Sequence, residues 1–210
     1  MATNIENIIA EVYDGRYQHR AWEETQGIML HRCGVNLVDK IVIGYDGRTV
    51  AKAFSGKLPE WEVVATRTGK QNAYTVFVGS DCGPEEYNGK LWQALPMDEI
   101  GWHGRQFSAG YIGLAWIADP RVKSLSEKAW WSMADICAMI CSARLWNPAD
   151  AIKGHGEVPT AHDGTKAPGE INACPGLSKK DLNIFRGDVA ALMKEKNLQA
   201  LLDIGLTFKA

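Results

Sequence analysis

The stretch "GIMLHRCGV" (residues 27–35) is a short apolar run that reaches a histidine and then an Arg-Cys-Gly sequence. Polar residues bound the run on both sides, a pattern typical of a buried β-strand. A strand is a rigid element, and a side chain at its end is held in a defined place. We therefore expect a buried strand that presents His31 at its end.

The rest of the chain mixes strands with helices. A run rich in aromatic and β-branched residues predicts a strand over 72–80, and the next strand, over 89–96, is expected to complete a hairpin. A near-continuous apolar run predicts a buried strand over 109–119, and a short strand is expected over 150–155. Helix-forming runs predict a short helix over 46–56 and long helices over 124–146 and 177–196. This order indicates an α/β domain with a central mixed β-sheet flanked by helices. We expect residues 1–26 to form a lead-in and residues 27–210 to form one catalytic domain with C-terminal helices.

The helix expected over 124–146 has the clearest signals. Ser124 and Glu127 have the spacing of a capping box, and Ser178 is a candidate N-cap for the following helix. Apolar residues at helical spacing predict one buried face, made of Trp130, Ala134, Cys137, Cys141 and Leu145. The two cysteines on this face are expected to be core residues and not a ligand pair.

Composition excludes several classes of function. The 210 residues are 46% hydrophobic and 23% charged, with a net charge of −2 and no basic stripe, so nucleic acid is not an expected partner. No apolar run approaches the roughly 20 residues of a membrane span, and we expect no membrane insertion. The first residues lack the features of a secretory signal, which favours accumulation in the cytoplasm. Five cysteines without a CxxC pair argue against a disulfide framework.

A polar loop, "KGHGEVPTAHDGTKAPGEINACPG" (153–176), carries His155, His162 and Cys174. Zinc favours Cys and His ligands, and a catalytic zinc site uses three protein ligands and an open position. His155 follows a predicted strand, and Cys174 precedes the Pro-Gly turn into a helix. Together with His31 they make a candidate site, in which each ligand stands at the end of an element. His162 is either a further ligand, a substrate contact or an exposed loop residue.

Five motifs occur in an order that resembles a known family. "GIMLHRCG", "NAYTVFVG", "IGWHGRQFSAGYIGLAWI", "KGHGEV" and "NACPGL" are similar to successive motifs of the zinc-dependent N-acetylmuramoyl-L-alanine amidases. That family includes the phage lysozyme-type amidases and the peptidoglycan recognition proteins. The resemblance covers residues 27 to about 180 and implies the same fold and a zinc cofactor.

The resemblance implies a role for individual residues. It makes His31, His155 and Cys174 the zinc ligands and Tyr74 a catalytic residue, as in the phage-type members. His103 matches a histidine near the substrate cleft, and Trp102 beside it is a candidate substrate contact.

Two departures from the family pattern bear on the chemistry. Many relatives carry a lysine two or three residues before the third ligand, where this chain has Asn172; we expect Lys166 of the longer loop to replace it and Asn172 to contact substrate. Some relatives carry a glutamate where this chain has Ala115, so a carboxylate base from that strand is absent. Glu157 is a candidate base, a support for a ligand, or a solvated loop charge.

The implied reaction is hydrolysis of the amide between N-acetylmuramic acid and L-alanine of the peptidoglycan stem peptide, through zinc-activated water. The alternatives are a zinc peptidase that cuts within the stem peptide and a non-catalytic peptidoglycan-binding module. The phage-type pattern favours an endolysin that stays in the cytoplasm of the infected host until a holin opens the membrane. We expect a monomer whose partner is bacterial peptidoglycan.

Overall fold

The computed structural model describes the chain in segments. These are residues 22–36, 41–44, 49–52, 74–81, 85, 88–93, 95, 97–101, 103, 108–118, 125–158 and 174–203.

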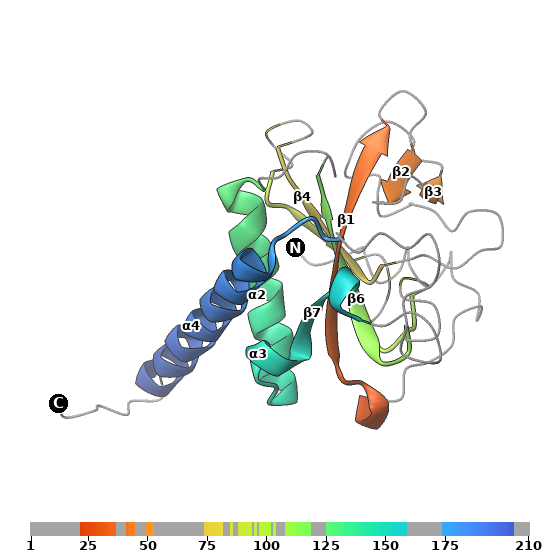
Figure 1. Cartoon of the computed structure of the whole chain (residues 1–210). Coiled ribbons are helices and arrows are strands. Elements are labelled where there is room, and N and C mark those ends of the chain that lie inside the picture. The colour runs from red at the N-terminus through yellow and green to blue at the C-terminus, as the bar shows by residue number, and fades with distance from the viewer. Residues whose placement is uncertain are drawn as a thin grey trace.

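Seven strands of the described part of the chain form one sheet at the centre of the fold (Figure 1). Its strands are β1 (Gly27–Asn36), β2 (Ile41–Gly44), β3 (Thr49–Lys52), β4 (Val76–Gly79), β5 (Leu91–Gln93), β6 (Tyr111–Ile117) and β7 (Ile152–Gly154). The order is β3-β2-β1-β6-β4-β5, with β7 also paired to β1. β7, β1, β6 and β4 are parallel neighbours, whereas β2, β3 and β5 join by antiparallel pairing. The predicted central mixed sheet is therefore confirmed, and so is the β4–β5 hairpin.

The long helices lie together on one side of this sheet (Figure 1). The helical elements are η1 (Trp22–Glu24), α2 (Glu127–Arg144), α3 (Pro148–Ala151), η5 (His155–Glu157) and α4 (Lys179–Asp203). A buried core cluster joins Ile28 and Leu30 of β1 to Trp116 of β6 and to both long helices. Trp116 donates its indole N–H to the carbonyl of Ala129 in α2 (3.0 Å), and its ring meets Phe185 of α4 at 5.4 Å.

Strand alternation turns His31 away from this core. Successive side chains of a strand point to opposite faces, and Ile28 and Leu30 belong to the helix-covered cluster. His31 therefore lies on the other face of the sheet, together with Ala115, its register partner on β6. The prediction that His31 ends its strand is wrong, because β1 continues to Asn36 through pairing with β6 and β2. The helices leave that face available for a site.

The predicted ends of the helices needed correction. The N-cap of α2 is Ser126, whose hydroxyl accepts from the N–H of Ala129 (3.2 Å), and not Ser124 in a capping box. Leu145, predicted to be buried, is the left-handed C-cap (φ 57°) and is 93% exposed. Ser178 does cap α4, accepting from the N–H of Asp181 (3.1 Å). This helix was predicted to end at residue 196, but it continues to Asp203.

Two other local predictions had opposite outcomes. The helix expected over 46–56 is wrong, because residues 49–52 form β3 and pair with β2; the adjacent strand offers backbone hydrogen bonds that outweigh a weak helical pattern. The assignment of Cys137 and Cys141 to the core is confirmed, since both side chains are fully buried. Burial raises the pKa of the Cys141 thiol to about 11.

The boundary predicted between residues 26 and 27 stays a prediction.

Within the described part of the chain, no helix combines the length and the apolar character needed to cross a bilayer.

Two glycines give a matched test of this packing. A Cβ at Gly27 would lie 2.0 Å from the carbonyl oxygen of Ala151, whereas a Cβ at Gly187 in α4 would meet nothing within 4 Å. We expect Gly27→Ala to lower the free energy of unfolding by about 1–3 kcal/mol through overpacking. Gly187→Ala should raise it by about 0.5–1 kcal/mol through helix propensity. Urea unfolding followed by circular dichroism measures both, and equal stability of the two variants would contradict the packing of α3 against β1.

Candidate metal centre

His31, His155 and Cys174 come together although their segments are far apart in the sequence. Their candidate ligand atoms all lie within 4.8 Å of one another. His31 is 1% exposed on β1, Cys174 is 6% exposed, and His155 is half-buried at the start of η5. Among the described residues, they form the one cluster of His, Cys, Asp and Glu side chains able to hold a metal ion.

Parallel pairing of β1 with β7 places the two histidines. Leu30 and Gly154 are register partners, and His31 and His155 are the next residues along their chains. Neighbouring parallel strands run in the same direction, so the two rings emerge side by side, with centroids 4.6 Å apart.

Backbone contacts bring Cys174 to the same place. The N–H of Gly156 donates to the carbonyl of Cys174 (2.8 Å), which ties the cysteine to the turn that carries His155. A Cβ at Gly154 would lie 2.9 Å from Cδ of Pro175 and 3.1 Å from a methyl group of Leu182. The absence of a side chain at Gly154 therefore lets the Cys-Pro segment approach the strand.

Burial keeps His31 in the form that binds metal. Desolvation lowers its pKa well below the ordinary value, and the nearby titratable rings of His155 and His103 lower it further. A neutral imidazole has a lone pair for a metal ion. The Nδ1 atom of His31 lies 4.0 Å from Sγ of Cys174, close to the about 3.6 Å that separates N and S ligands of a tetrahedral zinc ion.

Two further predicted site residues surround His31. The ring of Tyr74, 5% exposed, lies with its centroid 4.8 Å from that of His31. His103 places Nδ1 at 3.1 Å from Nε2 of His31. At the register position beside His31, Ala115 supplies only a methyl group, so no carboxylate comes from β6 at this point.

Four predicted site residues lie outside the described residues. They are Trp102, His162, Lys166 and Asn172.

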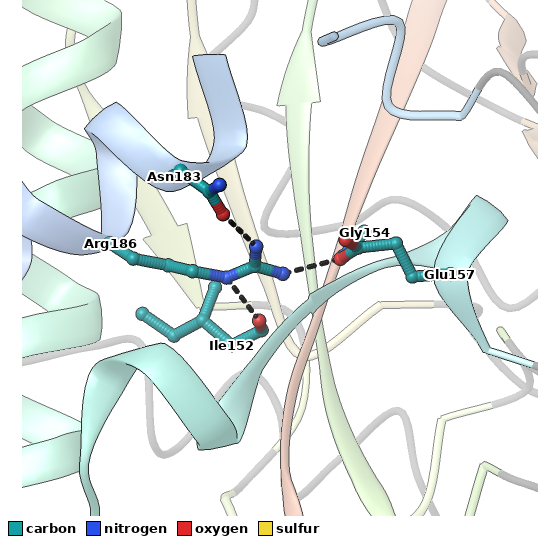
Figure 2. Close-up of polar contacts among 5 residues, drawn as sticks. All are labelled: Ile152, Gly154, Glu157, Asn183 and Arg186. Carbon is teal, nitrogen blue, oxygen red and sulfur yellow. Dashed lines mark hydrogen bonds and ion pairs between the residues drawn. The ribbon is translucent and has the colours of Figure 1, made fainter. Parts of the chain in front are cut away.

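Glu157 makes contacts that indicate a structural role beside His155 (Figure 2). Its Oε2 accepts from the N–H of Gly154 (2.9 Å) and pairs with the guanidinium of Arg186 from α4. The same guanidinium donates through Nε to the carbonyl of Ile152 (2.9 Å) and through Nη1 to Asn183 (2.8 Å). These contacts fasten β7 and the His155 turn to α4, and they favour a supporting role for Glu157 over that of a base.

Arg186 was missed by the sequence analysis. It follows Leu182 by four residues and precedes Val189 by three, so it falls on the buried face of α4, and its side chain is 10% exposed. A cation on a buried helix face is the signal that points to such a residue, because it requires a partner.

Removal of this guanidinium tests whether Arg186 holds β7 and the His155 turn against α4. We expect Arg186→Ala to lower the free energy of unfolding by about 2–4 kcal/mol, because Glu157 and the Ile152 carbonyl lose a charged donor. Lys196→Ala is the matched control, since its ion pair with Asp135 is about half exposed and should contribute less than about 1 kcal/mol. Urea denaturation measures the free energy of unfolding of both variants. If Arg186→Ala loses no more stability than the control, Arg186 does not hold β7 and the His155 turn against α4.

Comparison with known protein families identifies the family, and solved structures show a similar fold. Residues 21–176 match the N-acetylmuramoyl-L-alanine amidase family. The hydrolase AmiA of Staphylococcus aureus, solved with its ligand, is 13% identical over 93% of this chain and 94% of its own, with a TM-score of 0.54. The endolysin amidase LysCS of Clostridium intestinale URNW is 12% identical over 77% of this chain and 84% of its own, with a TM-score of 0.45. No curated protein matches in sequence. The family match spans all three candidate ligands, and the chain belongs to the N-acetylmuramoyl-L-alanine amidase family.

Proposed function

We propose that this amidase is zinc-dependent and that His31, His155 and Cys174 hold the metal. The observation that carries the proposal is the convergence of their ligand atoms within 4.8 Å, at the point where β7 ends beside β1. Two imidazoles and one thiolate are a donor set that suits zinc, and three ligands leave a fourth position for water or substrate.

Zinc, when bound, supplies a water of lowered pKa and polarises the amide carbonyl. The substrate bond is the amide between N-acetylmuramic acid and L-alanine of the stem peptide, which follows from the family. The chain's own residues have the task of placing this amide and of stabilising the negative charge that develops on its oxygen.

Among the described residues, Tyr74 is best placed to stabilise the negative charge on the amide oxygen. Its ring packs against His31 and, edge to face, against Phe77 at 5.4 Å, which fixes the direction of the phenol. A positioned phenol donates a hydrogen bond to an oxyanion. We propose Lys166 as a second donor, and Trp102, His162 and Asn172 as substrate contacts; all four rest on sequence alone. Glu157 is proposed as a support for His155.

We also propose that the protein is a phage endolysin that leaves the cytoplasm of the infected host at lysis. The support is the phage-type pattern, with Tyr74 beside the cluster and Ala115 where other members carry a carboxylate. Intracellular production with and without a holin tests this, since an endolysin lyses cells only with the holin. Lysis that is independent of the holin would contradict it.

Loss of a ligand tests the proposed metal site. We expect Cys174→Ala and His31→Ala to lose stoichiometric zinc and to reduce wall hydrolysis by more than about 10³-fold, because the metal supplies several kcal/mol of transition-state stabilisation. Elemental analysis measures the zinc. Mass spectrometry identifies the products, which should be stem peptides with free L-alanine amino termini.

Met139→Ala serves as the control, since that side chain is 58% exposed on α2. Full activity in either ligand variant would contradict the assignment of that residue as a metal ligand. New termini inside the stem peptide would instead indicate a peptidase.

Tyr74→Phe separates the phenol hydroxyl from the packing of the ring. We expect unchanged zinc content and a kcat lower by about 10²–10³-fold, the usual effect of removing one oxyanion donor. Lys166→Ala, measured in parallel, shows whether the loop lysine supplies a second donor. An unchanged kcat in Tyr74→Phe would remove Tyr74 from the mechanism.

A further inference from the structure

His103 lies against the sheet in a place prepared for its ring. It is 8% exposed, and its backbone N–H donates to the hydroxyl of Ser108 (3.3 Å). A Cβ at Gly113 of β6 would come within 2.6 Å of the His103 ring, so the ring lies on the bare backbone of this glycine. The Ile-Gly pattern of β6 thus admits His103 to the face of the sheet that carries His31.

The hydrogen bonds of His103 fix the position of its own proton. Nε2 lies 3.0 Å from the carbonyl oxygen of Tyr111, and a carbonyl accepts but never donates. Nε2 must therefore carry the N–H. A neutral imidazole has one N–H, so Nδ1 of His103 is an acceptor.

The hydrogen bond between the two rings then fixes the proton of His31. Nδ1 of His103 is 3.1 Å from Nε2 of His31, and an acceptor there requires His31 to donate from Nε2. The remaining nitrogen of His31, Nδ1, must then hold the lone pair. This is the nitrogen that faces Sγ of Cys174 at 4.0 Å.

We propose that His103 is a positioning residue that fixes the tautomer of His31, so that the Nδ1 lone pair points toward the metal. This inference rests on the proposed zinc function. A histidine of the other tautomer would turn an N–H toward Cys174 and would not bind a metal there. Both ring nitrogens of His103 face protein atoms, which favours this role over the substrate contact suggested by its sequence position.

Two amide substitutions separate the proton-directing role from simple filling of space. In His103→Asn the side-chain oxygen takes the place of Nδ1 and still accepts from His31, although the contact with Tyr111 is lost. In His103→Gln the amide reaches the place of Nε2 and the Tyr111 carbonyl, but no acceptor faces His31. A structural role alone would be served better by Gln, the larger residue.

Zinc affinity, measured by competition with a chelator of known affinity, is the first readout. We expect the zinc Kd to rise about 10–100-fold in His103→Gln, the usual effect of losing the partner of a ligand histidine. It should stay within about threefold of wild type in His103→Asn. Equal affinities in the two variants, or tighter binding by His103→Gln, would overturn the proposal.

The tautomer itself is the second readout and needs no metal. Two-bond ¹H–¹⁵N couplings of ¹⁵N-histidine-labelled, metal-free protein show which nitrogen of each ring is protonated. We expect His31 to be protonated at Nε2 in the wild type and in His103→Asn, and to gain the Nδ1–H form in His103→Gln. Protonation at Nδ1 in the wild type would refute the inference. A wild-type chain that holds no zinc, with His31 protonated at Nε2, would overturn the proposed function and leave the hydrogen-bond chain standing.

Discussion

The parallel pairing of β7 with β1 is the constraint on which the site depends. The register that sets Leu30 beside Gly154 places His31 of β1 next to His155, the residue that follows the last residue of β7. A slip of one residue would turn a histidine to the other face of the sheet, because side chains alternate along a strand. The distance between the two rings is therefore set by backbone hydrogen bonds of the sheet and not by the loop that follows it.

Glycines explain how other segments pack closely against the strands of the sheet. Gly27, Gly113 and Gly154 lie in β1, β6 and β7, and a Cβ at each would collide with a neighbouring segment. Gly27 admits the end of α3, Gly113 admits the His103 ring, and Gly154 admits the segment after Cys174. Glycine within a strand weakens it, and close approach of another part of the chain is the usual compensation. The glycines of the Ile-Gly motif in β6 and of the Gly-His motif at the end of β7 are thus required because a side chain there would collide with a neighbouring segment.

The sequence predicted what local patterns determine. The strand that carries His31 begins with a continuous apolar run, and α2 has helical periodicity, so both were found from nearest-neighbour chemistry. The continuation of β1 past His31 to Asn36 comes from its pairing with β2 and β6. β3 was misassigned because its strand conformation comes from pairing with β2, which no local pattern contains. The three ligands were selected by order and motif, but their meeting depends on β7 lying beside β1. The partner of Arg186 and the role of His103 could not be predicted, since each depends on a hydrogen bond to a residue 29 or 72 positions away.

Each candidate ligand has a support of its own, and the supports come from different layers of the fold. His103 on the site face holds His31, the Glu157–Arg186 pair from the helical layer holds the turn of His155, and the N–H of Gly156 holds Cys174. Metal ligands need partners that fix their direction, and partners on rigid elements do so better than partners on loops. Folding of the core thus aligns the donors before a metal arrives. Burial of His31, which would be costly for a charged ring, instead favours the neutral form that coordination requires.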